Sequence, residues 1–203
     1  MKSIRQLIDD EDAKKITIHR IIGIERFLQL LHEQQLTLIS SEMWQDPYEK
    51  ALKKHTDSRC GNQAFNTYGL CWSTESRSDA LWQIYSPNAL GIKITTTVGK
   101  VIVCLASSPA SQSLMDRTFI GAVSYLPERT SKKTGYSWPS GPLTLGASDF
   151  VHPISTFANA ISEITSLDES QLRSPTLLAR SFFIKRRAFQ HESEVRLLAF
   201  PEL

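Results

Sequence analysis

The chain has 203 residues, of which 41% are apolar and 22% are charged, a balance typical of a folded domain and not of a disordered segment. Lysine and arginine number 23 against 21 aspartates and glutamates, so the net charge of +2 gives no general electrostatic reason to expect nucleic acid or an acidic membrane as a partner. The three cysteines lack the Cys-x-x-Cys spacing of zinc and redox sites, so we expect reduced, structural thiols.

Two further features concern location. The N-terminal segment is charged and lacks the apolar run of a signal peptide, and no stretch approaches the roughly 18 to 20 apolar residues that cross a bilayer. We therefore expect a cytoplasmic protein with no membrane partner.

The first third of the chain predicts a strand, a helix and a second strand. Residues 1–15 are charged and without a clear period, so they are expected to form a lead-in or a short helix. Alternation predicts a first strand with His19 and Arg20 on opposite faces, and apolar residues at helical spacing predict the helix. Asp46-Pro47 indicates a turn. The expected elements are residues 16–22, 24–34 and 36–40.

The middle of the chain contains an apolar strand that ends at Ser73 and Thr74, followed by a helix that Ser78 or Asp79 could cap. Two β-branched runs separated by Val98-Gly99 predict a hairpin. The expected elements here are strands 68–72, 91–97, 100–105 and 119–126 and a helix in 76–85.

The C-terminal part begins with a stretch rich in Gly, Pro, Ser and Thr, expected as a long loop or insertion, and continues with two helices and a final strand. These are residues 132–148, 150–167, 170–179 and 192–200. The whole pattern predicts one domain over residues 1–203, of the α+β class, with a mixed and largely antiparallel sheet flanked by helices.

An acidic pair stands out in the last predicted strand. Glu192, Glu194 and Arg196 occupy alternate positions, so they share one face while Val195 and Leu197 point into the core. Two carboxylates so close raise the pKa of one of them, which suits an acid and base pair. The alternative is a solvated edge strand whose acids are neutralised by Arg196 and by the basic run at residues 185–187.

A second candidate site follows the strand that ends at Ser73. This strand and the helix carrying Trp82 and Tyr85 can form one wall of a ligand cleft, although large aromatic residues at such spacing also suit a core. No Gly-x-Ser-x-Gly motif surrounds Ser73, and glycine-rich phosphate loops are absent. No two histidines have ligand spacing on an expected helix, so no metal is expected.

Four segments of the chain, taken in order, resemble a large bacterial family catalogued as domain of unknown function 2971. The segments are LTLISSEMWQDPYEK, GLCWSTESRSDALWQIYSPNALGIKI, FIGAVSYLP and FFIKRRAFQHESEVRL. The order of elements is also similar to the layout of ADP-ribosyltransferases, which split NAD between nicotinamide and ribose. The resemblance implies NAD as a substrate and a site in which Arg20 or His19 contacts the dinucleotide.

The same resemblance assigns roles to the other candidate residues. Ser73 and Thr74 would lie beneath the nicotinamide ribose, and Tyr85 would stack on a ring. Glu194 would hold the ribose hydroxyl and stabilise the positive charge that develops on the sugar, while Glu192 would orient or deprotonate the acceptor.

Three functions are therefore open. The first is an NAD-dependent ADP-ribosyltransferase-like enzyme, a toxin or defence effector acting on a protein or nucleic acid. The second is a non-catalytic ligand-binding or regulatory module of the same fold, favoured if Arg196 occupies Glu194 in a salt bridge. The third is a metal-dependent nuclease.

Overall fold

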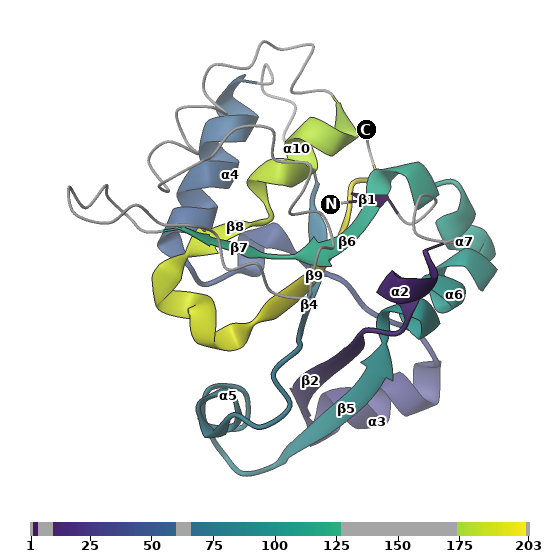
Figure 1. Ribbon diagram of the computed structural model, residues 1–203, viewed down its shortest axis with the longest axis vertical. Coiled ribbons are helices and arrows are strands. Elements are labelled where there is room, and N and C mark those ends of the chain that lie inside the picture. The colour runs from purple at the N-terminus through teal and green to yellow at the C-terminus, as the bar shows by residue number, and fades with distance from the viewer. Residues whose placement is uncertain (1, 4–9, 60–65, 127–173, 202–203) are drawn as a thin grey trace.

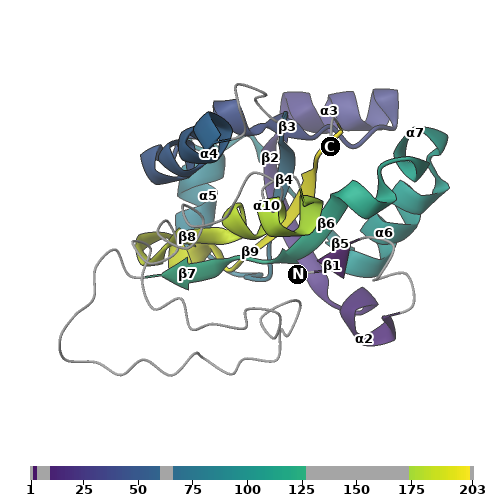
Figure 2. The ribbon, with the colours of Figure 1, turned by 90° about the horizontal axis from the view of Figure 1, so that it is seen from above.

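The computed structural model describes residues 2–3, 10–59, 66–126 and 174–201. Within these ranges no helix is long and apolar enough to cross a membrane. The expected loop at 132–148 and the expected helix at 150–167 lie outside the described residues. In both ribbon views β7, β8 and α4 lie to the left of the central strands and α2, α6 and α7 to the right (Figures 1 and 2).

The described residues form an α+β fold, as the sequence predicts. The strands are β1 Lys2–Ser3, β2 Thr17–Gly23, β3 Ile39–Ser40, β4 Tyr68–Ser73, β5 Gly91–Thr97, β6 Thr118–Ala122, β7 Ser124–Leu126, β8 Ile184–Arg186 and β9 Glu194–Ala199. The α-helices are α2 Glu11–Lys14, α3 Ile24–Glu33, α4 Pro47–Arg59, α5 Asp79–Tyr85, α6 Val98–Ser107, α7 Pro109–Gln112 and α10 Pro175–Ser181. Short 3-10 turns are η1 Ser41–Met43, η2 Met115–Arg117 and η4 Arg187–Glu192.

The main sheet has the strand order β1-β6-β9-β4-β2-β5, and all of its pairings are antiparallel. The strand β9 therefore lies between β6 and β4, near the middle of the sheet, and every one of its residues is buried. A separate parallel pair, β7 with β8, branches off after β6. The expected largely antiparallel sheet is confirmed.

Two apolar cores cover the two faces of this sheet. Val195 and Leu197 of β9 belong to the core that α2 and α6 cover, whereas Leu198 belongs to the core that α10 covers. Alternation along a strand sends neighbouring side chains to opposite faces, so a strand with both faces covered is buried throughout. Glu194 and Arg196 have the same parity as Leu198 and so lie on the face that α10 covers.

The edge of β4 opposite β9 is shared by two strands. β3 pairs with the start of β4 at Tyr68 and Gly69, whereas β2 meets it at its end, where His19 pairs with Ser73. β2 pairs with β5 along its full length, through Gly23 with Gly91, so β2 leaves β4 after that one bridge. The resulting split between β2 and β4 sets the shape of the candidate site.

Several elements form where the sequence predicts them. The helix α3, the strand β4 and the strand β5 are confirmed, and Ser78 caps α5 by accepting a hydrogen bond from the Leu81 N–H at 3.2 Å. The expected second strand is reduced to β3, and the single strand expected over 119–126 is divided between β6 and β7 at Val123.

The predicted hairpin after Thr97 is wrong, because residues 98–107 form helix α6. The β-branched run suggested a strand, but Val98, Val101 and Ile102 also have helical spacing and are all buried on one face. The Thr97 side chain accepts a hydrogen bond from the Lys100 N–H at 3.3 Å and so caps the helix. Burial of the helical face outweighs the strand propensity of these residues.

Replacing Thr97 with alanine should lower the free energy of unfolding by about 1 kcal/mol, because it leaves an N-terminal N–H of α6 without its side-chain acceptor. Urea unfolding followed by circular dichroism measures this change. Ser107→Ala is a matched control in the same helix: its exposed hydroxyl donates to the Val103 carbonyl at 2.8 Å, and its loss should change stability by less than about 0.5 kcal/mol. Equal losses in the two variants would contradict the capping role.

Candidate functional site

Six of the residues predicted from the sequence line one cavity of about 120 Å³. It lies where β4 ends and β9 begins, beside the middle of β2, α5 and the end of η4. The six residues are His19, Arg20, Ser73, Tyr85, Glu192 and Glu194. Thr74 is not among the lining residues; its hydroxyl donates to the Ser193 carbonyl at 3.2 Å and holds the turn before β9.

Ser73 joins three strands at the floor of this cavity. Its backbone pairs with His19 of β2 on one side and with Glu194 of β9 on the other. Its hydroxyl donates to the Glu192 carbonyl at 2.7 Å and accepts from the Glu75 N–H at 2.9 Å. The hydroxyl thus acts as both a donor and an acceptor, and its two bonds position the backbone of η4 and the turn after β4.

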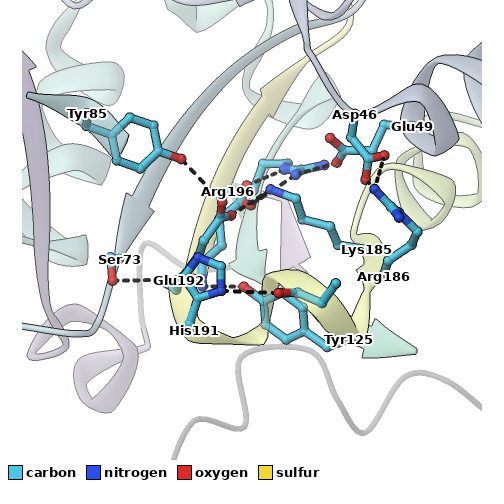
Figure 3. A network of polar contacts seen from close by, with 12 residues as sticks. Asp46, Glu49, Ser73, Tyr85, Tyr125, Lys185, Arg186, His191, Glu192 and Arg196 are labelled. Atoms are coloured by element: carbon cyan, nitrogen blue, oxygen red, sulfur yellow. Dashed lines mark hydrogen bonds and ion pairs between the residues drawn. The ribbon is translucent and has the colours of Figure 1, made fainter. Parts of the chain in front are cut away.

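Glu192 is not in the last strand, contrary to the sequence prediction. It ends the turn η4, and Ser193, with φ of 41°, separates it from β9. A residue in this left-handed conformation breaks the alternation, so Glu192 and Glu194 do not share a strand face as expected. Glu192 Oε2 accepts from Lys185 Nζ at 2.6 Å, and Oε1 accepts from the Tyr85 hydroxyl at 3.4 Å. Tyr85 points toward Glu192 from α5 (Figure 3).

Glu194 is bound on all sides. Its Oε1 accepts from Arg196 Nε at 2.5 Å, and its Oε2 accepts from Arg196 Nη2 at 3.1 Å and from Lys185 Nζ at 3.2 Å. A carboxylate offers about four acceptor positions, and these hydrogen bonds from two cations occupy three of them. Its side chain is 3% exposed.

Arg196 holds the centre of the charge cluster. Besides Glu194, it donates to Glu49 Oε1 at 2.6 Å and to the Phe182 carbonyl at 2.5 Å, and its guanidinium lies 4.5 Å over the Trp44 ring. Its side chain is 1% exposed. Glu49 of α4 approaches the cluster from the side opposite Tyr85 (Figure 3). We call Glu49, Lys185, Glu192, Glu194 and Arg196 the ion cluster.

The ion cluster shifts the pKa values of its members in physically consistent directions. Burial raises the pKa of Glu194, but the nearby Arg196 and Lys185 outweigh burial and lower it to about 2. Burial raises the pKa of Glu49 above its usual range despite Arg196. Burial lowers the pKa of Lys185, yet Glu194, Glu49 and Glu192 together raise it above its ordinary value. Lys185 and Glu194 therefore stay ionised at neutral pH.

The alternative of a solvated edge face is wrong in one respect and right in another. The strand β9 is central and buried, so the acids are not on an exposed edge. Lys185 and Arg196 do neutralise the acids, as that alternative supposed. Arg186 instead pairs with Asp46 at 3.0 Å.

His19 and Arg20 reach the same cavity even though neighbouring residues of a strand point to opposite faces. His19 Nδ1 lies 3.0 Å from the Thr95 hydroxyl on β5. Burial and the nearby Lys93 lower the pKa of His19, which favours a neutral imidazole at pH 7. Arg20 lines both this cavity and a second one of about 290 Å³. Because β2 leaves β4 after a single bridge, the Arg20 side chain is accessible from both.

Asp46 and Glu49, which pair with Arg186 and Arg196, were not among the candidate site residues predicted from the sequence. They belong to the run Asp46-Pro47-Tyr48-Glu49, in which the proline indicated a turn. Proline is also favoured at the first position of a helix, and here Asp46 Oδ1 accepts from the Tyr48 N–H at 3.0 Å at the start of α4. Reading this run as a helix start would have placed Glu49 in the first turn of a helix.

Among the described residues, no three His, Cys, Asp or Glu side chains gather as ligands for a metal ion. Comparison of the chain with protein-family models, with curated proteins and with solved structures gives no match.

Proposed function

We propose that the protein is an NAD-consuming enzyme similar to the ADP-ribosyltransferases, and that the first cavity binds the nicotinamide and its ribose. The observation that carries this proposal is the convergence of side chains from β2, β4, α5, η4 and β9 on one cavity. The strands that bear His19, Ser73 and Glu194 are adjacent in the sheet. The order of the elements along the chain does not by itself imply that these side chains lie together in space.

The contacts favour Glu192 over Glu194 as the carboxylate that faces the sugar. Glu194 accepts three hydrogen bonds from two cations, whereas Glu192 accepts one short bond from Lys185 and one long bond from Tyr85. In the proposed reaction the bond between ribose C1′ and the nicotinamide nitrogen breaks, and its electron pair leaves with the neutral nicotinamide. An acceptor nucleophile, from a protein or a nucleic acid, bonds to C1′ and gives its proton to Glu192 or to water.

The other side chains have positioning and binding roles in this proposal. Ser73 holds the backbone of Glu192. Tyr85 is 46% exposed, and its ring can stack on a base or on nicotinamide. Arg20 supplies a forked donor for phosphate. The cavity of about 120 Å³ is smaller than the roughly 300 Å³ of typical small-molecule pockets, so it suits one end of a dinucleotide.

A second function, a non-catalytic nucleotide-binding module, is favoured by the two ion pairs of Glu194. A carboxylate held by Arg196 and Lys185 has little negative potential left to stabilise a cationic sugar. In this module the ion cluster would have a structural role, and the cavity would bind its ligand without cleaving it.

The two functions differ in the release of nicotinamide from NAD by the purified protein. The enzyme should release it, and Glu192→Gln should lower the rate by about 100-fold or more, because it removes a charge close to the reacting bond. Chromatography of the reaction mixture measures the product. Glu25→Gln, which removes an exposed carboxylate on α3, is the control and should leave the rate unchanged.

Three results would change the proposal. Equal rates for the native protein and Glu192→Gln would remove Glu192 from the mechanism. A thermal shift that rises with NAD concentration without any release would favour the binding module, because a ligand of the native state raises apparent stability. No shift and no release would remove both functions.

A further inference from the structure

The second cavity, of about 290 Å³, has a chemistry of its own. It lies between α3, the segment 35–39 and the split between β2 and β4. Two arginines, Arg20 and Arg26, line it, and no aspartate or glutamate is among its described lining residues. A concave site with positive charge and no acid favours an anionic ligand.

Neither arginine is neutralised within the described part of the chain. Arg20 is half-buried, and it forms no ion pair with a described carboxylate. Arg26 Nη1 donates to Gln29 Oε1 at 2.9 Å, a neutral partner that orients the guanidinium without cancelling its charge. The Gln29 amide in turn donates to Glu33 at 2.9 Å. Burial lowers the pKa of Arg20, and the nearby Arg26 lowers it further, as expected for two cations that repel each other.

The remaining walls are apolar and aromatic. Leu30, Leu36 and Ile94 contribute aliphatic surface, while Trp72 and Tyr85 contribute rings. A ligand that satisfies both parts carries an anionic group for the arginines and a flat, apolar body for the rings. Arginine binds phosphate oxygens through two parallel donors, which favours a phosphate as the anionic group.

We propose that the second cavity binds a nucleoside phosphate, with the phosphate between Arg20 and Arg26 and the base against Trp72 and Tyr85. The nucleoside phosphate is either a separate molecule or the adenosine phosphate part of NAD, because Arg20 and Tyr85 also line the first cavity. The inference rests on the contacts of the second cavity and not on cleavage of NAD.

Calorimetric titration of the full chain with AMP tests the site. We expect saturable binding, at least about tenfold weaker in Arg26→Gln and Arg20→Gln, since each variant removes a charge-assisted bond. Arg26→Lys should bind with intermediate affinity because it keeps the charge and loses the fork. Lys100→Gln, which removes an exposed charge on α6, should bind as the native protein does. Arg26 is exposed, so Arg26→Gln remains a valid test even if Arg20→Gln fails to fold.

Adenosine and NAD provide two further arms of the experiment. Adenosine should bind at least about tenfold more weakly than AMP, because it lacks the phosphate. Competition between NAD and AMP would identify the ligand as part of NAD, and simultaneous binding would identify it as a separate nucleotide; both support the site. Equal affinities of AMP and adenosine, an unchanged affinity in Arg26→Gln, or no saturable AMP binding would overturn it. Nicotinamide release is measured independently, so failure of the enzyme proposal leaves this result intact.

Discussion

Arg196→Met should lower the free energy of unfolding by about 5 kcal/mol, the largest effect expected of a single substitution in this chain. Methionine fills much of the space of the arginine stem but leaves Glu194 with Lys185 as its one cation in the ion cluster. It also removes the cation that, among the described residues, pairs with Glu49. Removing one partner of a buried ion pair costs roughly 3 to 5 kcal/mol, and here the same side chain serves two acids and a carbonyl. Urea unfolding measures the loss.

A double-mutant cycle with Glu194→Gln separates the charge interaction from packing. The double variant Arg196→Met with Glu194→Gln should be more stable than the sum of the two single losses predicts, because the buried charge left by Arg196→Met is removed. Arg196→Lys should lose less than Arg196→Met, since it keeps a cation but not the fork. A loss below about 1 kcal/mol for Arg196→Met would contradict a structural role for the ion cluster.

Glu194→Gln should change how stability depends on pH. The pKa of Glu194 is lowered from its ordinary 4.5 to about 2 in the folded protein. The folded state therefore favours the ionised form, and this contribution is present above about pH 4.5 and is lost as the pH falls toward 2. At about 1.4 kcal/mol per pKa unit, it amounts to about 3 kcal/mol.

Glu49 contributes with the opposite sign. Burial raises its pKa, so the folded state favours its protonated form, and proton uptake by Glu49 offsets part of the loss as the pH falls. Urea unfolding between pH 6 and 2.5 should show a gap between the native protein and Glu194→Gln that closes toward low pH. Glu11→Gln, at an exposed position paired with Lys14, should run close to the native curve. Native and Glu194→Gln curves that stay parallel would contradict the lowered pKa.

The elements that sequence reasoning predicted well carry local signals. The strand β4 is a compact apolar run, α5 has a serine cap, and α3 has a strong helical period. The helix α6 was mispredicted because its residues fit both the alternation of a strand and the spacing of a helix. Packing against the core under α6 decides in favour of the helix. Local patterns cannot contain that information, because the core comes from distant parts of the chain.

The candidate site was predicted in its residues but not in its internal contacts. The order of the motifs along the chain was enough to assign His19, Ser73, Tyr85 and Glu194 to one candidate site. The state of the acids depends on partners far away in the chain: Glu49 lies 147 positions from Arg196. The conformation of Ser193, which takes Glu192 off the strand, leaves no sequence signal, because a serine carries no preference for positive φ.

The position of β9 has a consequence for how the protein acquires its structure during synthesis. In the described chain β9 is made after all the strands that surround it, yet it lies between β6 and β4. Until it emerges from the ribosome, β6 and β4 lack their common neighbour, and Glu49 lacks its partner Arg196. The sheet is therefore completed last near its centre, and until then β4 and β6 keep open edges of the kind that can pair with other chains.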